Sequence, residues 1–212
     1  VDYGPYPKEV LDWIRAHAAP CVQGNHDAWV VKNYRDGGTF ESMPVVDRAW
    51  VHHNASLLDE ADITYLEQLP RARTFTLDEQ HYWMTHLYQE YEEIVSLHAY
   101  QRFRQQLLGA DGTTDHKRLI IGHTHRQAVR YLADDLLWLN PGSVSYRRRD
   151  DPVQSAHYAV IVDGVISLKR LPYDLTPLRT YVAQVALKAA EIDAATRFFA
   201  IRAVEIPAVV TN

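Results

Sequence analysis

The sequence predicts an α/β protein in which polar side chains follow the ends of buried strands. Three observations carry this prediction. Apolar residues recur at helical spacing in several segments, first at Val10, Leu11 and Ile14. Two strand-like segments end in glycine, at Gly24 and at Gly122. An Asp-Gly pair at 163–164 separates two alternating runs, which is typical of a β-hairpin.

Size and composition narrow the class of protein. A chain of 212 residues can bury one substantial core, and we expect a single domain. The net charge of −5 argues against a general nucleic-acid binder, which should be basic. Cys21 is the only cysteine, so no internal disulfide forms, and the residue is interpreted as a small core side chain. With no apolar run near the ~20 residues that span a bilayer and no signal peptide, we expect a cytoplasmic protein without membrane partners.

The first part of the chain is predicted to be mainly helical. A turn-rich opening leads to a helix that runs to about His17, with Pro7 in its first turn. Pro20 to Gln23 is predicted to be a short strand. Residues 28–56 are interpreted as a helix followed by an excursion over the surface. A short helix from Ile63 to Leu69 ends at Pro70.

The second part is predicted to be rich in strands. A hairpin is expected from strands at 73–77 and 81–85, which deliver His86 at their end, and a helix is expected over 89–108. A buried strand at 117–121 ends at Gly122. Further strands are predicted at 127–131, 136–139, 157–162 and 165–171, followed by a helix at 178–192. The last twenty residues carry no clear pattern.

Four residues of metal-ligand type follow the predicted strand ends. Asn25 can donate a carbonyl oxygen, and His86, His123 and His125 can each offer an imidazole nitrogen. Because ligands bind at the carboxyl ends of strands in open α/β sheets, we expect these side chains to meet. Mixed nitrogen and oxygen ligands favour Mn²⁺, Fe, Zn²⁺ or Co²⁺ over Mg²⁺ or Ca²⁺.

The order of these motifs resembles that of the calcineurin-like metallophosphoesterase superfamily, in particular its small bacterial and archaeal phosphodiesterase branch. The resemblance rests on Gly24-Asn25-His26-Asp27, a lone His86 and Gly122-His123-Thr124-His125, and it covers roughly residues 1–171. Asn140-Pro141-Gly142-Ser143-Val144 is also similar to a segment typical of this branch. The resemblance implies a four-layer α/β/β/α sandwich of two mixed sheets over residues 1–212, in which 172–212 form a C-terminal helical extension.

The resemblance also implies a mechanism and roles for single residues. It implies hydrolysis of phosphate esters, most readily phosphodiesters, by a hydroxide that two divalent transition-metal ions activate, with manganese favoured. Asn25, His86 and His123 would bind one ion and His125 the other. His26 would contact the phosphate and help to protonate the leaving oxygen, and Asp27 would orient His26. Arg148 would bind a substrate phosphate.

Part of the family pattern is absent from this sequence. The first motif, Asp-x-His, and the bridging Asp of the second motif, Gly-Asp-x-x-Asp, are missing, and Asp2 resembles the closing Asp of that second motif. We therefore expect the fold to be N-terminally truncated as given, and the native protein to be longer. The alternative is a truncated or degenerate family member that acts as a binding or structural module with little activity.

The sequence leaves open the roles of two arginines and the kind of phosphoesterase. Arg148 and its neighbours could equally form a solvated charge run beside Asp150 and Asp151, and Arg126 could contact substrate or lie on the sheet surface. The enzyme could be a protein phosphatase or a dinucleoside polyphosphate hydrolase, and a metal-binding regulator would bind ions without turnover. A small phosphate ester or nucleotide-like molecule is the expected partner. The helix near 89–108 or the apolar tail could support a homo-oligomer.

Overall fold

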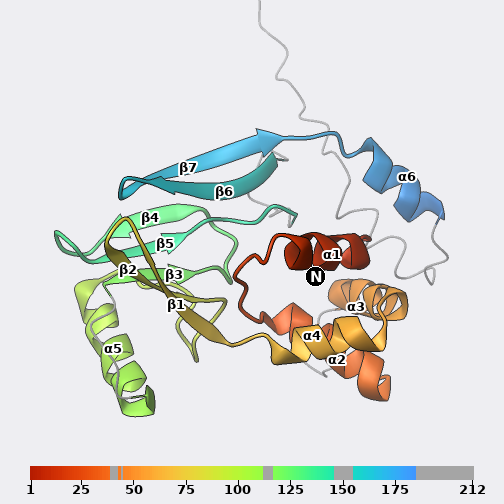
Figure 1. Ribbon diagram of the computed structural model, residues 1–212, viewed down its shortest axis with the longest axis horizontal. Coiled ribbons are helices and arrows are strands. Elements are labelled where there is room, and N and C mark those ends of the chain that lie inside the picture. The colour runs from red at the N-terminus through yellow and green to blue at the C-terminus, as the bar shows by residue number, and fades with distance from the viewer. Residues whose placement is uncertain (39–42, 44, 112–116, 146–154, 185–212) are drawn as a thin grey trace, which may run out of the picture.

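The computed structural model describes residues 1–38, 43, 45–111, 117–145 and 155–184 (Figure 1). Its helices are α1 (Pro7–Ala16), α2 (Asn25–Asp36), α3 (Val45–Leu57), α4 (Glu60–Gln68), α5 (Leu97–Asp111) and α6 (Thr176–Gln184). Its strands are β1 (Ala72–Leu77), β2 (Gln80–Thr85), β3 (Arg118–Ile121), β4 (Ala128–Tyr131), β5 (Leu137–Asn140), β6 (Ser155–Val162) and β7 (Val165–Pro172).

The strands form two sheets. The larger sheet has five strands in the order β1-β2-β3-β5-β4 and is mixed, because β3 runs parallel to both β2 and β5 while the outer pairs are antiparallel. The smaller sheet is the antiparallel pair β6-β7. In Figure 1 the helices α1 to α4 gather beside the strands, and α5 lies apart from them against the larger sheet. The expected α/β fold with two sheets is confirmed.

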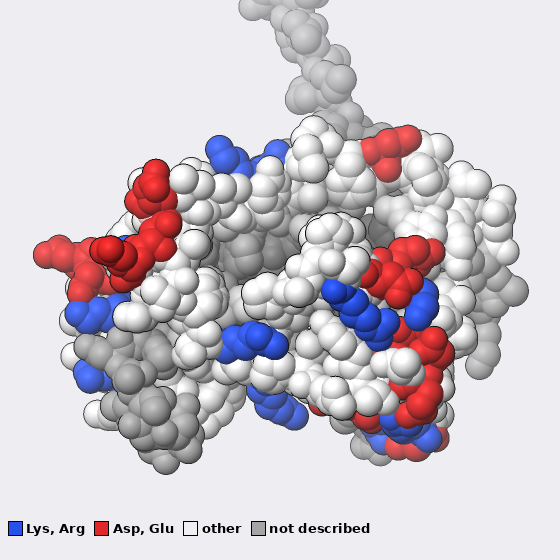
Figure 2. All heavy atoms as spheres, in the orientation of Figure 1, with Lys and Arg blue, Asp and Glu red and all other residues white. Residues whose placement is uncertain are grey.

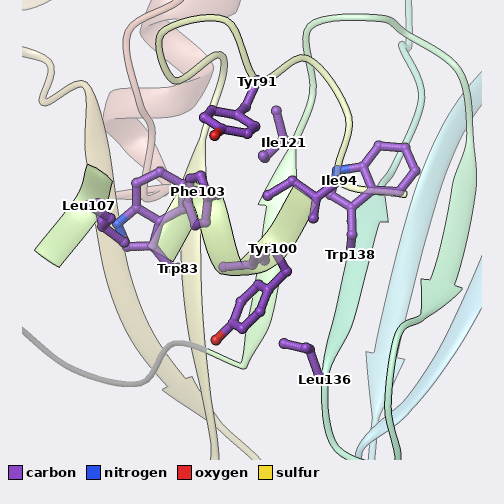
Figure 3. Packing of buried hydrophobic residues seen from close by; sticks show 10 residues of the cluster. Trp83, Tyr91, Ile94, Tyr100, Phe103, Leu107, Ile121, Leu136 and Trp138 are labelled. Carbon is purple, nitrogen blue, oxygen red and sulfur yellow. The ribbon is translucent and has the colours of Figure 1, made fainter. Parts of the chain in front are cut away.

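One core lies between α5 and the larger sheet (Figure 3). Phe103 of α5 is 1% exposed and meets the ring of Trp83 on β2 edge to face, with ring centroids 5.3 Å apart. Tyr91 meets Phe103 in the same way, at 5.5 Å. Such aromatic pairs add about 0.5–1.5 kcal/mol each to the free energy gained from burial. This core fixes β2 and β3, whose carboxyl ends carry His86 and Gly122.

A second core joins the helices α1 to α4. Leu11, Val30, Val51 and Ile63, one from each helix, are all at most 1% exposed and belong to one apolar cluster. The cluster holds the N-terminus of α2, where Asn25 begins the helix, against the other three helices. The two cores therefore support different parts of the same site.

Two predictions for the helical part are wrong. Pro20 to Gln23 does not form a strand, because no neighbouring strand pairs with it and its described backbone bond is from Gln23 N to Pro70 O, at 2.9 Å. Residues 45–57 form α3 rather than a surface excursion. Trp50, Val51 and Ala55 face the interior, although the polar run 52–54 hides their helical period in the sequence.

The strands predicted between residues 73 and 171 are confirmed with small shifts of their ends. The Asp163-Gly164 pair turns the β6-β7 hairpin with φ of +50° and +73°, as the hairpin pattern requires. The helix expected over 89–108 begins only at Leu97, and Ser96 Oγ accepts a bond from Ala99 N at 3.1 Å at this N-terminus. Of the helix expected at 178–192, the described part is α6, and the rest lies outside the described residues. Among the described residues, no helix is both long enough and apolar enough to cross a bilayer.

Candidate metal centre

Three chain segments meet at the carboxyl ends of β2 and β3. His86 follows β2, Gly122 and His123 follow β3, and Asn25 is the first residue of α2. The backbone N–H groups of Gly122 and His123 both donate to the carbonyl oxygen of His86, at 3.2 and 3.0 Å. These bonds fix the two strand-end loops relative to each other.

The side chains of Asn25, His86 and His123 converge on one point. His86 Nε2 lies 2.8 Å from Asn25 Oδ1 and 3.0 Å from His123 Nδ1. Adjacent ligands of an octahedral ion with bonds of about 2.1 Å are about 3.0 Å apart, so both of these distances fit neighbouring ligands of an ion of this size. No group of three or more His, Cys, Asp or Glu side chains with metal-binding spacing occurs among the described residues. The set consists of two histidines and one amide.

Burial gives the two imidazoles the protonation state that a ligand needs. Burial, and then the neighbouring His123, lower the pKa of His86 to about 4. Burial also lowers the pKa of His123. Both rings are therefore neutral near pH 7 and keep a nitrogen lone pair.

Gly24 leaves the space that the His86 ring occupies. A Cβ atom added at Gly24 would lie 3.3 Å from His86 Cγ and 3.4 Å from His86 Nδ1. The backbone at Gly24 has a φ of −96°, which any residue adopts. The glycine is thus required by the close approach of the ring and not by backbone conformation.

His26 is held by Asp2, whereas the sequence assigned this role to Asp27. The Nδ1 atom of His26 lies 2.5 Å from Asp2 Oδ2, and Asn54 of α3 donates to Asp2 Oδ1 at 2.8 Å. Asn54 is fully buried and the Asp2 side chain is 1% exposed. This arrangement fixes one nitrogen of His26 and leaves Nε2 for a substrate.

Asp27 points back to the start of its own helix. Its Oδ2 accepts the backbone N–H of Gly24 at 2.8 Å. Asp27 thus bonds the start of its own helix, and the contact with His26 Nδ1 comes from Asp2 instead.

His125 lies next to the convergent donors in an unusual backbone conformation. Its φ is +56°, and its N–H donates to Gly122 O at 2.9 Å. His125 lines a pocket of about 290 Å³ together with Tyr3, His26, Asp27 and His86. Within the described part of the chain, no group of three or more His, Cys, Asp or Glu side chains forms a second ion site around His125. Its metal-binding role remains a prediction, as do those of Asn25, His86 and His123.

Asn140 fixes the loop that carries both histidines. Its Nδ2 donates to Gly122 O at 3.1 Å and to Thr124 Oγ1 at 3.0 Å, and its Oδ1 accepts from Gly142 N at 2.9 Å. The side chain is 0% exposed and uses both polar atoms. The 140–144 segment thus supports the site, as its position in the sequence indicates.

The mouth of the site carries both signs of charge. A cavity of about 650 Å³ is lined by Thr124 and by charged side chains, namely Glu90, Glu92, Glu93, Arg126 and Arg130. Glu92 Oε1 lies 3.9 Å from His123 Nε2, so this cavity adjoins the donors. The face in Figure 2 likewise shows acidic and basic side chains side by side rather than a continuous basic surface. Arg148 lies outside the described residues.

Sequence reasoning missed two side chains near His26. Asn54 lies on a helix that was not predicted, and Trp29 was not assigned to the site. The ring centroids of Tyr3 and Trp29 lie 4.2 and 4.4 Å from that of His26. Trp29 follows His26 by three positions on a helix, and this spacing was the one signal that could have indicated such a contact.

Comparisons with known proteins agree with this geometry. The family model described as the calcineurin-like phosphoesterase superfamily domain matches residues 3–163. A crystal structure of a hypothetical protein from Pyrococcus horikoshii is similar, with a TM-score of 0.69, 16% identity, and coverage of 92% of this chain and 81% of the other. A metallophosphoesterase from Sphaerobacter thermophilus is similar with a TM-score of 0.62 and 20% identity, over 93% of this chain and 84% of the other. No curated protein matches the sequence.

Proposed function

The chain belongs to the calcineurin-like phosphoesterase superfamily, and from this premise we propose that it hydrolyses phosphodiesters with the help of two divalent metal ions. Hydrolysis of phosphate esters is the chemistry of the family in general. The choice of diesters and of two ions, with Mn²⁺ favoured, is our proposal. It includes Asn25, His86 and His123 as ligands of one ion and His125 as a ligand of the other.

The convergence of Asn25, His86 and His123 is the observation that carries the proposal. The three residues lie far apart in the sequence, yet His86 Nε2 lies 2.8 Å from Asn25 Oδ1 and 3.0 Å from His123 Nδ1. Burial lowers the pKa of His86 to about 4, so its ring stays neutral at the pH where a phosphodiesterase works. When bound, divalent ions would neutralise phosphoryl oxygens and lower the pKa of an attacking water.

His26 and Asp2 supply the protein's own part of the chemistry. In-line attack on phosphorus leaves negative charge on the leaving oxygen, which a proton donor on that side stabilises. The Asp2 carboxylate accepts the Nδ1–H of His26 and would stabilise the imidazolium form, whose Nε2–H can be given to this oxygen and leave a neutral ring that keeps its Nδ1–H. In the proposed mechanism Asp27 acts through the start of α2, where it fixes Gly24 beside His86.

The charges at the mouth support a small substrate. Three glutamates line the outer cavity beside two arginines. A long polyanion would be repelled by the glutamates, whereas a single phosphodiester carries only one negative charge. We therefore propose a small phosphodiester or nucleotide-like ester, and not a nucleic acid, as the substrate.

The first test measures metal content and turnover on the purified chain. With Mn²⁺ supplied, about two ions per chain by mass spectrometry together with hydrolysis of bis(p-nitrophenyl) phosphate would support the two-ion proposal, and one ion or none would contradict it. His86→Ala should lose metal and turnover together, because it removes the central donor. His26→Gln should keep the metal and lower kcat by roughly a hundredfold or more, because it removes a proton donor.

The two variants also separate the proposal from its main alternative. Bound metal with no turnover of any phosphodiester or phosphomonoester would contradict the enzyme and support a binding module. Turnover confined to phosphomonoesters would contradict the diester assignment alone. Equal activity of His86→Ala and the unaltered chain would remove the observation on which the proposal rests.

A further inference from the structure

Tyr3 adopts a backbone conformation that a residue with a large side chain rarely adopts. Its φ is +59°, in the left-handed region that favours glycine. The hydroxyl of Ser145 donates to the carbonyl oxygen of Tyr3 and ties it to the segment that follows β5. Strained residues that the surrounding fold holds in place are concentrated at functional sites, so the position of this ring calls for a functional explanation.

The Tyr3 ring lies between two histidines of the site. Its centroid is 4.2 Å from the ring of His26, at an interplanar angle of 47°, and 5.9 Å from the ring of His125, edge to face. Trp29 contacts the ring of His26 as well, at 4.4 Å. Tyr3 is half-buried and lines the 290 Å³ pocket with both histidines. An aromatic ring thus lines the pocket beside His26.

The chemistry proposed for His26 identifies the part of a substrate that would lie beside the Tyr3 ring. His26 gives a proton to the leaving oxygen, so the carbon skeleton attached to this oxygen must lie close to His26 and its neighbours. The face of a tyrosine ring favours flat aromatic groups, which stack on it, over saturated groups of equal size. A purely supporting role for Tyr3 would not depend on whether the bound group is aromatic.

We propose that Tyr3 determines specificity by stacking on an aromatic leaving group, so that the substrates are phosphodiesters whose leaving alcohol carries an aryl ring or a nucleobase. This inference rests on the proposed function. It also explains the strained backbone of Tyr3, because a φ of +59° holds the Tyr3 ring beside His26 and His125.

The experiment compares two ligands that differ only in aromaticity. Phenyl phosphate and cyclohexyl phosphate are titrated by calorimetry into the Mn²⁺-loaded chain, and each is also tested as a competitive inhibitor of bis(p-nitrophenyl) phosphate hydrolysis. We expect phenyl phosphate to bind about fivefold more tightly. Tyr3→Phe should keep this ratio, and Tyr3→Leu should reduce it to about one.

A further variant keeps the test valid if Tyr3→Leu does not fold. Asparagine tolerates positive φ, so Tyr3→Asn should preserve the backbone and a melting temperature no lower than that of the unaltered chain, and still lose the phenyl preference. A ratio that stays the same in the folded variants would overturn the inference, even where kcat falls. Because binding is measured without turnover, an inactive chain with an intact phenyl preference would contradict the proposed function and support the role of Tyr3.

Discussion

At the scale of single residues, the position of His86 depends on the absence of a side chain at residue 24. A Cβ atom there would lie 3.3 Å from His86 Cγ, and the ring would have to give way by a few tenths of an ångström. Such a shift would disturb the spacing of His86 Nε2 from Asn25 Oδ1 and His123 Nδ1, which is now 2.8 and 3.0 Å. The geometry of the three donors is thus sensitive to one methyl group.

We therefore predict that Gly24→Ala weakens metal binding and leaves the fold intact. Small errors in the orientation of a metal ligand cost about tenfold to a hundredfold in affinity, and we expect about tenfold for Mn²⁺ by calorimetry. Gly4→Ala is the matched control, because its Cβ would make an ordinary contact of 3.6 Å with Ser145 Oγ. Equal Mn²⁺ affinity of the two variants would show that the ring adapts without loss.

The ligand-type residues could be predicted from the sequence, and their polar neighbours could not. Asn25 and His123 each directly follow a glycine, and His86 follows the end of a predicted strand, so their order along the chain was informative. The contact between Asp2 and Asn54 joins residues 52 positions apart. No local pattern records such a contact, because tertiary packing alone brings it about.

At the scale of secondary structure, helix α3 contributes to the site indirectly, through a contact with Asp2. Its Asn54 is fully buried and makes its one described bond to Asp2, whose second oxygen faces His26. We predict that Asn54→Leu lowers kcat by roughly tenfold while KM stays the same, because Asp2 loses a partner but substrate contacts are untouched. Steady-state kinetics of the Mn²⁺-loaded chain measure both constants.

Two matched variants of α3 show whether the effect passes through Asp2. Asn54→Asp places a second carboxylate against Asp2 and should impair kcat more than Asn54→Leu does, since like charges repel. Ser56→Ala, on the exposed side of the same helix, should be neutral. An Asn54→Leu enzyme with a changed KM and an unchanged kcat would contradict a role for Asn54 in positioning His26.

Hairpins could be predicted at this scale because their turn residues are local. Asp163 and Gly164 adopt the positive φ values that their types allow. By contrast, Pro20 to Gln23 has strand-like composition and forms none, since a strand needs a partner and sequence alone does not supply one. Helix α3 was missed for a different reason, since its polar residues 52–54 interrupt the apolar spacing by which a helix is recognised in a sequence.

At the scale of the whole molecule, the sequence predicts the α/β class but not how the parts are joined. The strand order β1-β2-β3-β5-β4 depends on non-local pairing, such as that of β3 with β5. The contacts between α1 and α4 are also non-local. Lys8 and Arg15 of α1 donate to the carboxylate of Asp62 on α4, at 3.0 and 2.6 Å. This buried carboxylate is the polar link within the helical core.

The bonds from Lys8 and Arg15 to Asp62 should make the free energy of unfolding depend on pH within a defined range. Burial pushes the pKa of Asp62 up, but the hydrogen bonds from Lys8 and Arg15 outweigh burial, and the net pKa lies below the ordinary value of 3.8. A carboxyl with a lower pKa in the folded state stabilises the fold above its unfolded-state value of about 3.9. This contribution is lost as the pH falls through the folded-state pKa.

We predict that Asp62→Asn costs about 2 kcal/mol of unfolding free energy at pH 7, because charge-assisted hydrogen bonds to a buried carboxylate are lost. Urea unfolding of both chains from pH 7 to pH 3 measures the difference between them. The difference should stay constant down to about pH 5 and shrink below about pH 4, since a protonated Asp62 and the asparagine that replaces it are both neutral. Subtracting the variant removes the effect of other carboxylates. A difference that persists unchanged at pH 3 would mean that Asp62 stabilises the helical core through packing or helix capping rather than through its charge.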